Sequence, residues 1–399
     1  MFLTREPSPP PPILRGSNNN HHLLPDDMVF DILVKLPVKS ILRCKSLCKF
    51  WDSSITSPYF ISTHVNNNNN KDDDDHGYII NMLRPNKISP SNTFDMIYEV
   101  GIPLDFRLYG QIVGSCNGLL CLAGCGCGII YLWNPSIRKF KKLPNSCLGP
   151  SIVTLGFAYH SQNNDYKVVR ISRSFLSTPF PSVPEIEVYT LSSDSWRRVE
   201  ISLRTDDIRF NHNNFNLPTP FVSGALHWMA CITEEKDITE EKDKRGEEII
   251  VSFDVNTEKF REIAVPDPSA PSYKSCLALF KGKLAFITFG GGSEQLGHQY
   301  SIWVMRDYGV HDYESWNKLF VAPSQSISLC TAFTQYSLMI GYLKYKKEFK
   351  CFLIDTATLH EWDTDTDFQY PSCVATFMES LTLLDRDGAD CNDRGNQEE

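Results

Sequence analysis

The feature that most constrains the fold of this chain is a repeat built on pairs of large residues. Three segments consist of an apolar strand, a polar turn and an aromatic residue seven positions after the last large residue of the strand. They are Trp133–Phe140, Tyr189–Trp196 and Phe253–Phe260. Each continues with a basic residue and then an aliphatic one, and looser copies end at Trp316 and Trp362. Such a repeat predicts a fold assembled from similar small units.

The spacing of these aromatic anchors indicates the kind of unit. They stand at 140, 196, 260, 316 and 362, so the intervals are 56, 64, 56 and 46 residues. The longest interval contains a charged insertion, residues 234–248. A second series of Gly-centred strand starts occurs at Asn117-Gly118, Ser223-Gly224 and Lys281-Gly282. A period of about 50 residues favours a kelch-type β-propeller, in which the anchors fill the space between neighbouring sheets.

The rest of this region also predicts strands. Short apolar runs are separated by Gly, Pro, Asn, Asp and Ser, and no long amphipathic helix interrupts them, which disfavours a parallel α/β sheet. The runs lie at 118–123, 129–133, 166–171, 186–191, 225–230, 249–255, 283–289, 300–305, 337–343, 350–355 and 379–384. About six irregular blades fit between Gly77 and Asp385 at this period. A twisted β-sandwich is the structural alternative.

The residues before the repeat carry helix signals. Pro25 suits a first helical turn, apolar residues recur at helical spacing up to position 36, and Pro37 stops that helix. We expect a second helix at 38–43 and a third at 44–55, which Pro58 ends. The chain is therefore mainly β, with a small three-helix module at its start.

Polar and like-charged segments divide the chain into domains, because they cannot bury enough apolar surface to offset the cost of ordering their backbones. We expect a disordered N-terminus at 1–22, the helical module at 23–65, a linker or disordered loop at 66–77, a β domain at 78–386 and a disordered tail at 387–399.

Charge and cysteine usage narrow the class of protein. The net charge is −9, which disfavours general binding to nucleic acid or to anionic membranes. Thirteen cysteines are an odd number, and most lie in apolar runs, as buried thiols of a reducing compartment do. We therefore expect the protein in the cytoplasm, the nucleus or both, with no membrane association.

The landmarks of the helical module occur in a fixed order. They are Leu24-Pro25, Ile32-Leu33, Leu36-Pro37, Ser40-Ile41-Leu42-Arg43, Cys48-Lys49-Phe50-Trp51 and Pro58-Tyr59-Phe60. This order closely resembles the F-box. The departures are confined to Cys44, Leu47 and Phe50, where the family often has an aromatic residue, a valine and a small residue.

The β region is similar to the F-box-associated domain of the plant F-box/kelch group, which includes S-locus F-box-like proteins. The matching stretches are Cys116–Cys121, Leu132–Pro135, Asp165–Arg170, Glu187–Tyr189, Asp194–Trp196, Gly224–Trp228, Ile302–Met305 and Glu379–Leu383. The resemblance implies a substrate-recognition subunit of a Skp–cullin–F-box ubiquitin ligase. In that role the F-box docks a Skp-type adaptor and through it a cullin, and the β domain holds a target protein.

This reading implies no catalytic residue, cofactor or metal in the chain itself. Two rivals stay open: a scaffold that binds the adaptor without driving degradation, and an enzyme or lectin built on a propeller. Cys116, Cys121, Cys125 and Cys127 crowd within one segment without the second, distant pair of a zinc site, so we predict a Gly-rich hairpin there. His227 lies in an apolar strand and is predicted to be buried and hydrogen-bonded.

Short helices with so many apolar residues cannot hide all of them internally, and an exposed apolar patch usually marks an interface. The predicted adaptor contacts are Leu24, Pro25, Ile32, Leu33, Leu36, Pro37, Leu42 and Trp51, with Arg43 and Lys49 at the polar rim. The competing interpretation is that these residues pack among themselves, and it applies most to Leu33 and Trp51.

The target-binding surface is predicted from two long irregular stretches, 172–184 and 204–220. They carry Phe175, Phe180, Arg209, Phe210, His212 and Phe215. Exposed aromatic residues beside arginine are typical of interfaces, and loops carry function on rigid scaffolds. The alternative is that these stretches are long connections whose aromatic side chains are tucked beneath them.

Overall fold

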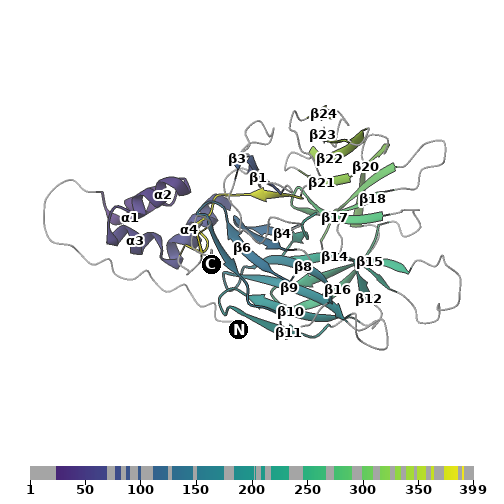
Figure 1. Cartoon of the computed structure of the whole chain (residues 1–399), viewed down its shortest axis with the longest axis horizontal. Helices are drawn as coiled ribbons and strands as arrows, with labels where there is room; N and C mark the ends of the chain where they lie inside the picture. The colour runs from purple at the N-terminus through teal and green to yellow at the C-terminus, as the bar shows by residue number, and fades with distance from the viewer. Residues whose placement is uncertain are drawn as a thin grey trace, which may run out of the picture.

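The computed structural model has two parts, a group of helices and a larger assembly of β-sheets (Figure 1). It describes residues 24–69, 77–81, 87–89, 98–99, 111–124, 128–146, 151–174, 184–201, 203, 208–211, 217–232, 246–266, 274–289, 299–308, 315–323, 329–333, 338–345, 348–355, 361–363, 373–384 and 389–390.

The helices are α1 (Asp26–Leu33), α2 (Val38–Lys45), α3 (Lys49–Ile55) and α4 (Pro58–Asn69). Pro25 and Pro37 occupy the N-cap positions of α1 and α2, where a missing amide proton costs no helical hydrogen bond. The third helix was predicted to begin at Cys44, but it begins at Lys49. The chain leaves the helical conformation at Cys48, whose φ is −160°.

Helix α4 was not predicted, since Pro58 was expected only to end a helix. It also includes residues 66–69 of the segment expected to be a linker. The reason lies in tertiary contacts: the Asn68 side chain is buried and donates a hydrogen bond to the Glu379 carbonyl oxygen at 3.0 Å. His64 Nε2 donates to the Leu36 carbonyl oxygen at 3.3 Å. These bonds let a polar asparagine run continue the helix.

The described strands form six antiparallel sheets, which we call sheets A to F. Sheet A contains β1 (Gly77–Asn81), β2 (Lys87–Ser89), β3 (Tyr98–Glu99) and β25 (Cys373–Phe377). Sheet B contains β4 (Gln111–Cys116), β5 (Leu119–Ala123), β6 (Ile130–Asn134), β7 (Lys139–Lys142) and β26 (Ala389–Asp390). Sheet C contains β8 (Ser151–His160), β9 (Asp165–Ser174), β10 (Glu185–Thr190) and β11 (Ser195–Val199).

Sheet D contains β12 (Ile208–Phe210), β13 (Phe221–Val222), β14 (Ala225–Ile232), β15 (Glu247–Asp254) and β16 (Lys259–Ala264). Sheet E contains β17 (Lys274–Phe280), β18 (Lys283–Phe289), β19 (Gln299–Met305) and β20 (Trp316–Pro323). Sheet F contains β21 (Leu329–Phe333), β22 (Leu338–Tyr345), β23 (Glu348–Asp355) and β24 (Glu361–Asp363).

The sequence repeat corresponds to one hairpin in each of five sheets, which confirms it as a structural unit. The paired residues lie directly opposite each other on adjacent strands. The pairs are Trp133 with Phe140, Tyr189 with Trp196, Phe253 with Phe260, Met305 with Trp316, and Leu353 with Trp362. In the first three hairpins the residue two positions before the anchor has a positive φ, 56° at Arg138, 49° at Asp194 and 56° at Glu258. This left-handed residue turns the chain back into the outer strand.

The Gly-centred series also has a structural counterpart. Asn117-Gly118, Ser223-Gly224 and Lys281-Gly282 are two-residue hairpin connections that lead into β5, β14 and β18. Both residues of each pair have a positive φ. A type I′ turn needs this, and it matches the twist of the strands.

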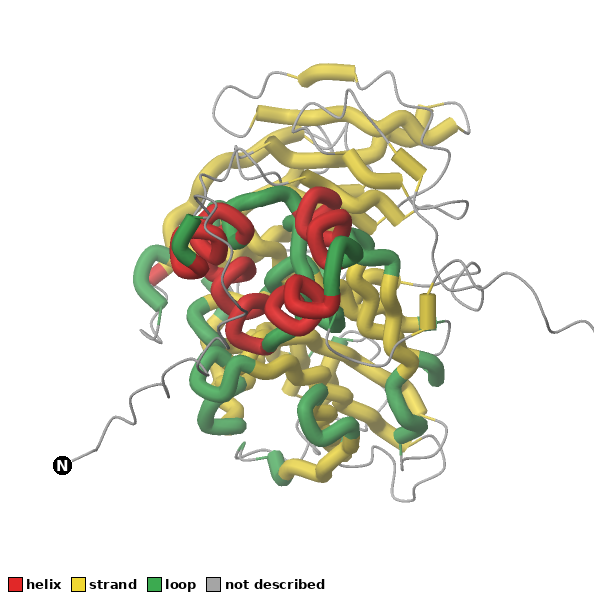
Figure 2. The backbone as a smooth tube through the Cα atoms, turned by 90° about the vertical axis from the view of Figure 1, so that its left-hand side faces the viewer, coloured by secondary structure: helices red, strands yellow, loops and turns green. Residues whose placement is uncertain are grey.

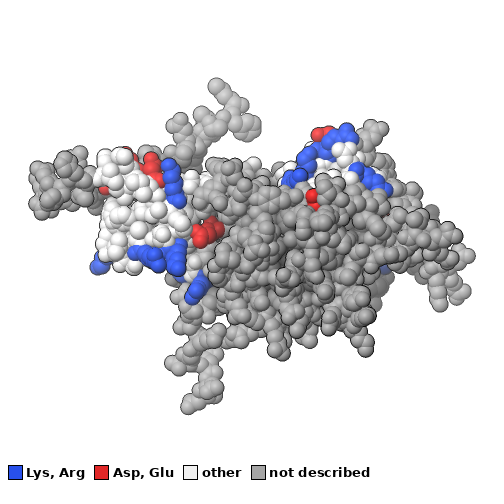
Figure 3. All heavy atoms as spheres, turned by 90° about the horizontal axis from the view of Figure 1, so that it is seen from above, with Lys and Arg blue, Asp and Glu red and all other residues white. Residues whose placement is uncertain are grey.

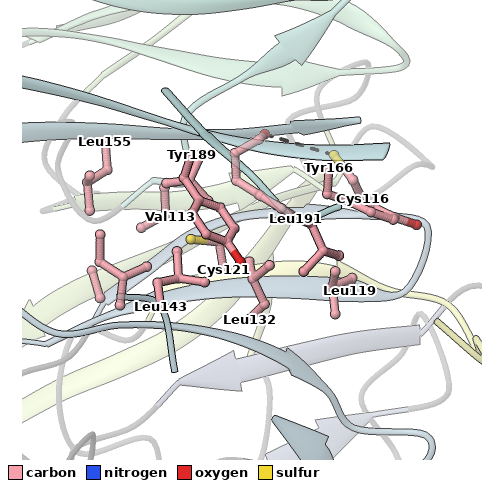
Figure 4. Packing of buried hydrophobic residues seen from close by; sticks show 14 of the residues in the cluster. Val113, Cys116, Leu119, Cys121, Leu132, Leu143, Leu155, Tyr166, Tyr189 and Leu191 are labelled. Carbon is pink, nitrogen blue, oxygen red and sulfur yellow. Dashed lines mark hydrogen bonds between the residues drawn. The ribbon is translucent and has the colours of Figure 1, made fainter. Parts of the chain in front are cut away.

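The sheets are arranged as a β-propeller. Contacts join β4 to β8, β8 to β14, β14 to β17, β17 to β21, β21 to β25 and β25 back to β4. Buried clusters fill the spaces between neighbours: one lies between sheets A and B, one between B and C, one between C and D, and one between D and E. Figure 4 shows the cluster between B and C, where Leu132 and Leu143 face Leu155 and Tyr189.

Three segments differ from the sequence predictions. Residues 379–384, predicted as a strand, form an irregular stretch followed by a turn, and Leu381 and Leu384 pack against the helices. Ala389–Asp390 of the expected tail form β26, because the outer edge of β7 offers unpaired backbone groups. Glu247 and Glu248 of the charged insertion belong to β15, where Glu248 accepts a hydrogen bond from Ser275. The predicted run at 337–343 falls within β22, except that Ser337 lies outside the described residues.

Candidate functional site

Exposed apolar side chains are concentrated on the helices. Nine large hydrophobic side chains are exposed among the described residues, and six of them lie between residues 24 and 59. They are Leu24, Met28, Ile32, Leu47, Phe50 and Tyr59. We call this set the helical apolar surface. Because the described part of the propeller exposes only three large hydrophobic side chains, this concentration on the helices indicates an interface.

The predicted adaptor contacts fall into three groups. Leu24, Pro25, Ile32, Pro37, Arg43 and Lys49 are exposed. Leu36, Leu42 and Trp51 are partly buried and pack on the core of the helical module. Leu33 is only 7 % exposed, so it supports the module from within, as the competing interpretation proposed for it. Contact with an adaptor remains a prediction for all of them.

Four members of the helical apolar surface were not among the predicted contacts: Met28, Leu47, Phe50 and Tyr59. Leu47 is the most exposed of the six, at 73 %. The sequence placed it inside a continuous third helix, on the face of Trp51 and Ile55. The chain actually breaks between α2 and α3, and Leu47 lies in that break. A sequence signal for a helix that starts after Cys48 would have been needed to predict that Leu47 is exposed.

The opposite side of the helical module packs against the propeller. Its core comprises Leu33, Val34, Val38, Ile41, Ile55, Phe60 and Ile61, joined by Leu381 from the segment that follows β25. Leu381 is fully buried. The Val38 amide donates to a carboxylate oxygen of Glu379 at 2.9 Å, which also satisfies one free amide at the start of α2.

The segment Glu379–Leu384, which we call the junction segment, is held from the propeller side as well. Asn134, at the end of β6, donates its side-chain amide to the carbonyl oxygens of Ser380 and Thr382 at 2.9 and 2.8 Å. The Ser380 amide donates to the Ser136 hydroxyl at 3.1 Å. The helices are therefore fixed to the propeller through hydrogen bonds and a shared apolar core.

A cavity of about 100 Å³ lies at this junction. Ile61 and Val65 of α4 line one side, and Tyr166, Leu191 and Thr382 line the other. The Tyr166 hydroxyl contacts the Thr382 hydroxyl at 3.4 Å. Burial raises the pKa of this phenol, so it stays neutral.

The topology gives the propeller two distinct ends. The helices contact the end that carries the turns β6–β7, β8–β9 and β10–β11, through Ile137, Asn164 and Leu191. In an antiparallel sheet every second connection emerges at the opposite end, so the β5–β6 and β9–β10 connections lead out there. Figure 1 shows the helices on one side of the sheets, and Figure 2 looks from the helical side onto the strands behind.

The predicted target-binding residues belong to the end away from the helices, as far as they are described. Arg209 and Phe210 lie in β12, which pairs with the end of β14 remote from the Ser223-Gly224 turn. Arg209 is exposed, whereas Phe210 is partly buried against Trp228, with ring centroids 6.3 Å apart. Phe175, Phe180, His212 and Phe215 lie outside the described residues.

His227 and two cysteines carry side chains that could take part in chemistry, but they are buried in strands of the propeller. His227 is buried, as predicted; its Nε2 accepts from the Tyr308 hydroxyl at 2.7 Å, and its Nδ1 faces the Pro220 carbonyl. Burial lowers the pKa of His227 to about 4, so the ring is neutral at physiological pH. Cys116 and Cys121 are buried in β4 and β5, and burial raises the pKa of the Cys116 thiol to about 12. Cys125 and Cys127 lie outside the described residues.

Within the described part of the chain, no helix combines the length and apolar character needed to cross a membrane.

Comparisons with known proteins divide the chain in the same way. The family model of the F-box domain matches residues 22–63, and that of the F-box associated beta propeller domain matches residues 72–356. An F-box/kelch-repeat protein of Arabidopsis thaliana is 26 % identical over 315 residues, which cover 75 % of this chain and 79 % of the relative. F-box protein CPR1 of the same plant is 27 % identical over 317 residues, 74 % of this chain and 72 % of the relative. Among solved structures, TolB from Acinetobacter baumannii aligns with a TM-score of 0.46 at 12 % identity, covering 82 % of this chain and 73 % of that protein.

Proposed function

Because the chain belongs to the family of F-box proteins with an F-box-associated β-propeller domain, we propose that it is the substrate-recognition subunit of a Skp–cullin–F-box ubiquitin ligase. F-box proteins are non-catalytic adaptors of such ligases, and an F-box implies binding to a Skp-type adaptor. In this proposal the chain supplies positioning: it holds a target lysine at high effective concentration near the ubiquitin-charged enzyme. The complex would act in the cytoplasm, the nucleus or both.

The observation that carries the proposal is the helical apolar surface. Its six side chains are exposed, whereas the buried residues of the helices form one core with Leu381 of the junction segment. The core of the module thus contacts the propeller, and the helical apolar surface would contact a partner. Pro37, Arg43 and Lys49 are exposed as well, which suits the polar rim of an interface.

We further propose that sheets A to F are the six blades of one closed propeller. The contacts of the innermost strands return from β25 to β4, and β25 pairs with β1 over five residue pairs. A late strand thus completes the first sheet, which ties the two ends of the domain together. Closure of this kind removes exposed sheet edges at the centre of the ring.

The target would bind at the end of the propeller away from the F-box. The end of β9 and strand β12 lie there, and Arg209 of β12 presents an exposed cation next to Phe210, whose ring packs against Trp228. The rigid junction supports this arrangement, because a target held at that end keeps a fixed orientation toward the adaptor side.

Adaptor binding is tested with the full chain carrying Ile32→Asp and Leu47→Asp. Both side chains are exposed, at 48 % and 73 %, so the fold should survive while the apolar contact is lost. We expect at least a tenfold loss of affinity for a Skp-type adaptor, since buried interface anchors commonly contribute about 2 kcal/mol. The control is Leu279→Asp, which places a negative charge at a leucine of the propeller that is also exposed, at 43 %.

Adaptor binding that the double variant retains, with an unchanged thermal midpoint, would refute the docking assignment. The proposed degradation role is tested separately by depletion of the protein in cells. A bound target that accumulates on depletion supports the ligase role, and a bound target whose half-life does not change favours the scaffold. Arg209→Glu, compared with the exposed Arg198→Glu on β11, tests whether target capture occurs at the far end.

A further inference from the structure

Sheet E carries several exposed positive charges at one of its ends. Its described side chains include four exposed cations, Lys281, Lys283, Arg306 and Lys318, and one acid, Asp307. The chain as a whole has a net charge of −9, so this surface opposes the overall balance. In Figure 3, lysine and arginine atoms gather on the described part of the propeller that lies away from the helices.

The four cations lie around one end of the sheet. Lys283 Nζ donates to the Arg306 carbonyl oxygen at 3.3 Å, and the Arg306 guanidinium donates to the Asn317 side-chain oxygen at 2.5 Å. Lys318, the next residue of β20, is paired with Trp303 and extends from the opposite face of the strand, and Lys281 lies in the turn before β18. Neighbouring strands lie about 4.8 Å apart, so the backbone positions of the four residues span roughly 10–15 Å around the end of the sheet.

Among the described residues, these cations differ from the cations that follow the aromatic anchors of sheets B and C, which have acidic partners. In sheets B and C the cation after the aromatic anchor pairs with an acid of the next sheet, Lys141 with Asp194 and Arg197 with Glu258. None of the four cations of sheet E forms an ion pair with another described residue. No ion pair with a described residue therefore neutralises their charge.

Apolar and aromatic groups lie among the charges. Lys318 Nζ stands 4.9 Å from the centre of the Trp303 ring, and Lys281 Nζ stands 5.9 Å from that of Phe280. Leu319 and Tyr308 are exposed, at 42 % and 37 %, and the Tyr308 hydroxyl is fixed by its hydrogen bond to His227. Positive charge with ordered aromatic rings and exposed aliphatic atoms is typical of protein interfaces.

The position separates this surface from the other two sites. The F-box contacts sheets B and C and the junction segment, whereas sheet E stands three sheets from B in the ring of contacts. Lys281, Arg306 and Lys318 lie at the ends of strands, on the side of the Lys281-Gly282 turn. The end of β9 and strand β12, which carries Arg209, lie at the opposite end of sheets C and D.

We propose that this end of sheet E, comprising Lys281, Lys283, Arg306, Lys318 and the exposed Leu319 and Tyr308, is a docking surface for an extended acidic segment of a partner protein. At about 3.3 Å per residue, a segment of roughly four to five residues spans the four cations. Carboxylates along it would meet the ammonium and guanidinium groups, and interspersed aliphatic side chains would cover Leu319. The acidic balance of the whole chain favours a protein segment over nucleic acid, whose long anionic backbone would also meet the negative remainder of the molecule.

The test measures binding of a fluorescein-labelled peptide of about twelve residues, made of glutamate, aspartate and leucine, to the full chain by fluorescence anisotropy at low ionic strength. A peptide with glutamine and asparagine in place of the acids is the neutral probe. The variant is Lys281→Glu with Lys318→Glu, neither of which donates a hydrogen bond in the described structure. The control is Lys142→Glu with Lys259→Glu, which makes the same change in net charge on the exposed outer strands of sheets B and D.

We expect the acidic peptide to bind, the sheet E variant to weaken binding at least tenfold, and the control to change it less than about twofold, with all thermal midpoints alike. Binding should also weaken as salt is raised, because exposed charges are screened. The proposal is overturned if the acidic peptide does not bind, if the neutral probe binds equally, or if both variants lose the same affinity. Tighter binding of an oligothymidylate than of the acidic peptide would likewise overturn it in favour of nucleic acid.

Discussion

The Asn134 side-chain amide donates to the carbonyl oxygen of Ser380 at 2.9 Å and so joins positions 246 residues apart in the sequence. Asn134 is fully buried, and its second amide proton reaches Thr382 at 2.8 Å. The side-chain oxygen of Asn134 accepts a hydrogen bond from the Ser136 backbone amide at 2.9 Å, and this bond orders the β6–β7 turn. One side chain therefore links the aromatic repeat of sheet B to the segment on which the F-box rests.

Replacement of Asn134 by alanine should destabilise the propeller and loosen the F-box. The change leaves two carbonyl oxygens buried without a donor, and such a loss costs about 1–3 kcal/mol per group. We expect the free energy of unfolding, measured with urea, to fall by about 2–4 kcal/mol, and proteolysis near the junction segment to accelerate. Asn145→Ala, at an exposed position in the next connection, is the control and should change stability by less than about 0.5 kcal/mol.

Gly118 and Gly282 offer a matched pair, because both have a positive φ, 74° and 70°. A Cβ atom on Gly118 would lie 2.3 Å from the Met378 carbonyl oxygen and 2.4 Å from the Ser380 Cβ, whereas one on Gly282 meets nothing within 4 Å. Gly282→Ala should therefore cost only the left-handed strain of about 1–2 kcal/mol. Gly118→Ala should cost clearly more and should also weaken adaptor binding, because the junction segment must shift. Equal losses of thermal stability in the two variants would contradict this account.

The sequence predicted the repeating part of the fold because each hairpin is specified locally. The seven-residue spacing of Tyr189 and Trp196 reflects a turn of fixed length, and the Gly-centred pairs reflect turns that need positive φ. The apolar alternation of each strand then places the anchors between sheets. These signals lie within a few residues of one another, so they are readable without the rest of the chain.

The junction could not be predicted in the same way, because long-range contacts determine it. Residues 379–384 have the apolar pattern of a strand, yet Leu381 is buried against the F-box and the backbone is held by Asn134. Helix α4 continues through an asparagine run because Asn68 finds a partner in Glu379. For the adaptor surface, the sequence identified exposed residues such as Leu24 and Ile32. It missed Leu47 because a break of three residues between α2 and α3 left no strong local signal.

Glu258 links sheets C and D, since it accepts from Lys167 Nζ at 2.8 Å and from the Arg197 guanidinium at 2.5 Å. The Lys167 side chain is largely buried, so Glu258→Gln leaves its ammonium group without the negative charge of Glu258 and with only neutral acceptors, such as the Val255 carbonyl. We expect a loss of about 2–4 kcal/mol in the free energy of unfolding at pH 7. Glu185→Gln is the control, because its contact with Arg198 is 3.6 Å long and both side chains are at least half exposed. It should cost less than about 0.5 kcal/mol.

The Glu258 contribution should also disappear in acid. Burial alone would raise the pKa of Glu258, but hydrogen bonds from Arg197 and Lys167 outweigh it and hold the pKa below its usual value of 4.5. The folded state thus binds this proton less readily than the unfolded state does. The stability difference between wild type and Glu258→Gln should be complete above about pH 4.5 and should shrink as the pH falls through the folded pKa. A difference that stays constant down to pH 3 would exclude the ion pair as its source.

His227 should give a second pH dependence in a higher window. Burial lowers its pKa from 6.5 to about 4, against the opposing influence of the Pro220 carbonyl, so the folded protein keeps the ring neutral while the unfolded chain binds a proton below pH 6.5. Stability should therefore fall as the pH drops from 6.5 to about 4, by a total on the order of 3 kcal/mol, and this component should be absent in His227→Gln. Urea unfolding of both proteins between pH 4 and 8 measures the difference. The control is Tyr308→Phe, which removes the hydroxyl that donates to His227 Nε2 but keeps the imidazole ring, and it should retain the fall in stability with pH. Parallel curves of stability against pH for wild type and His227→Gln would show that the buried imidazole does not cause this fall.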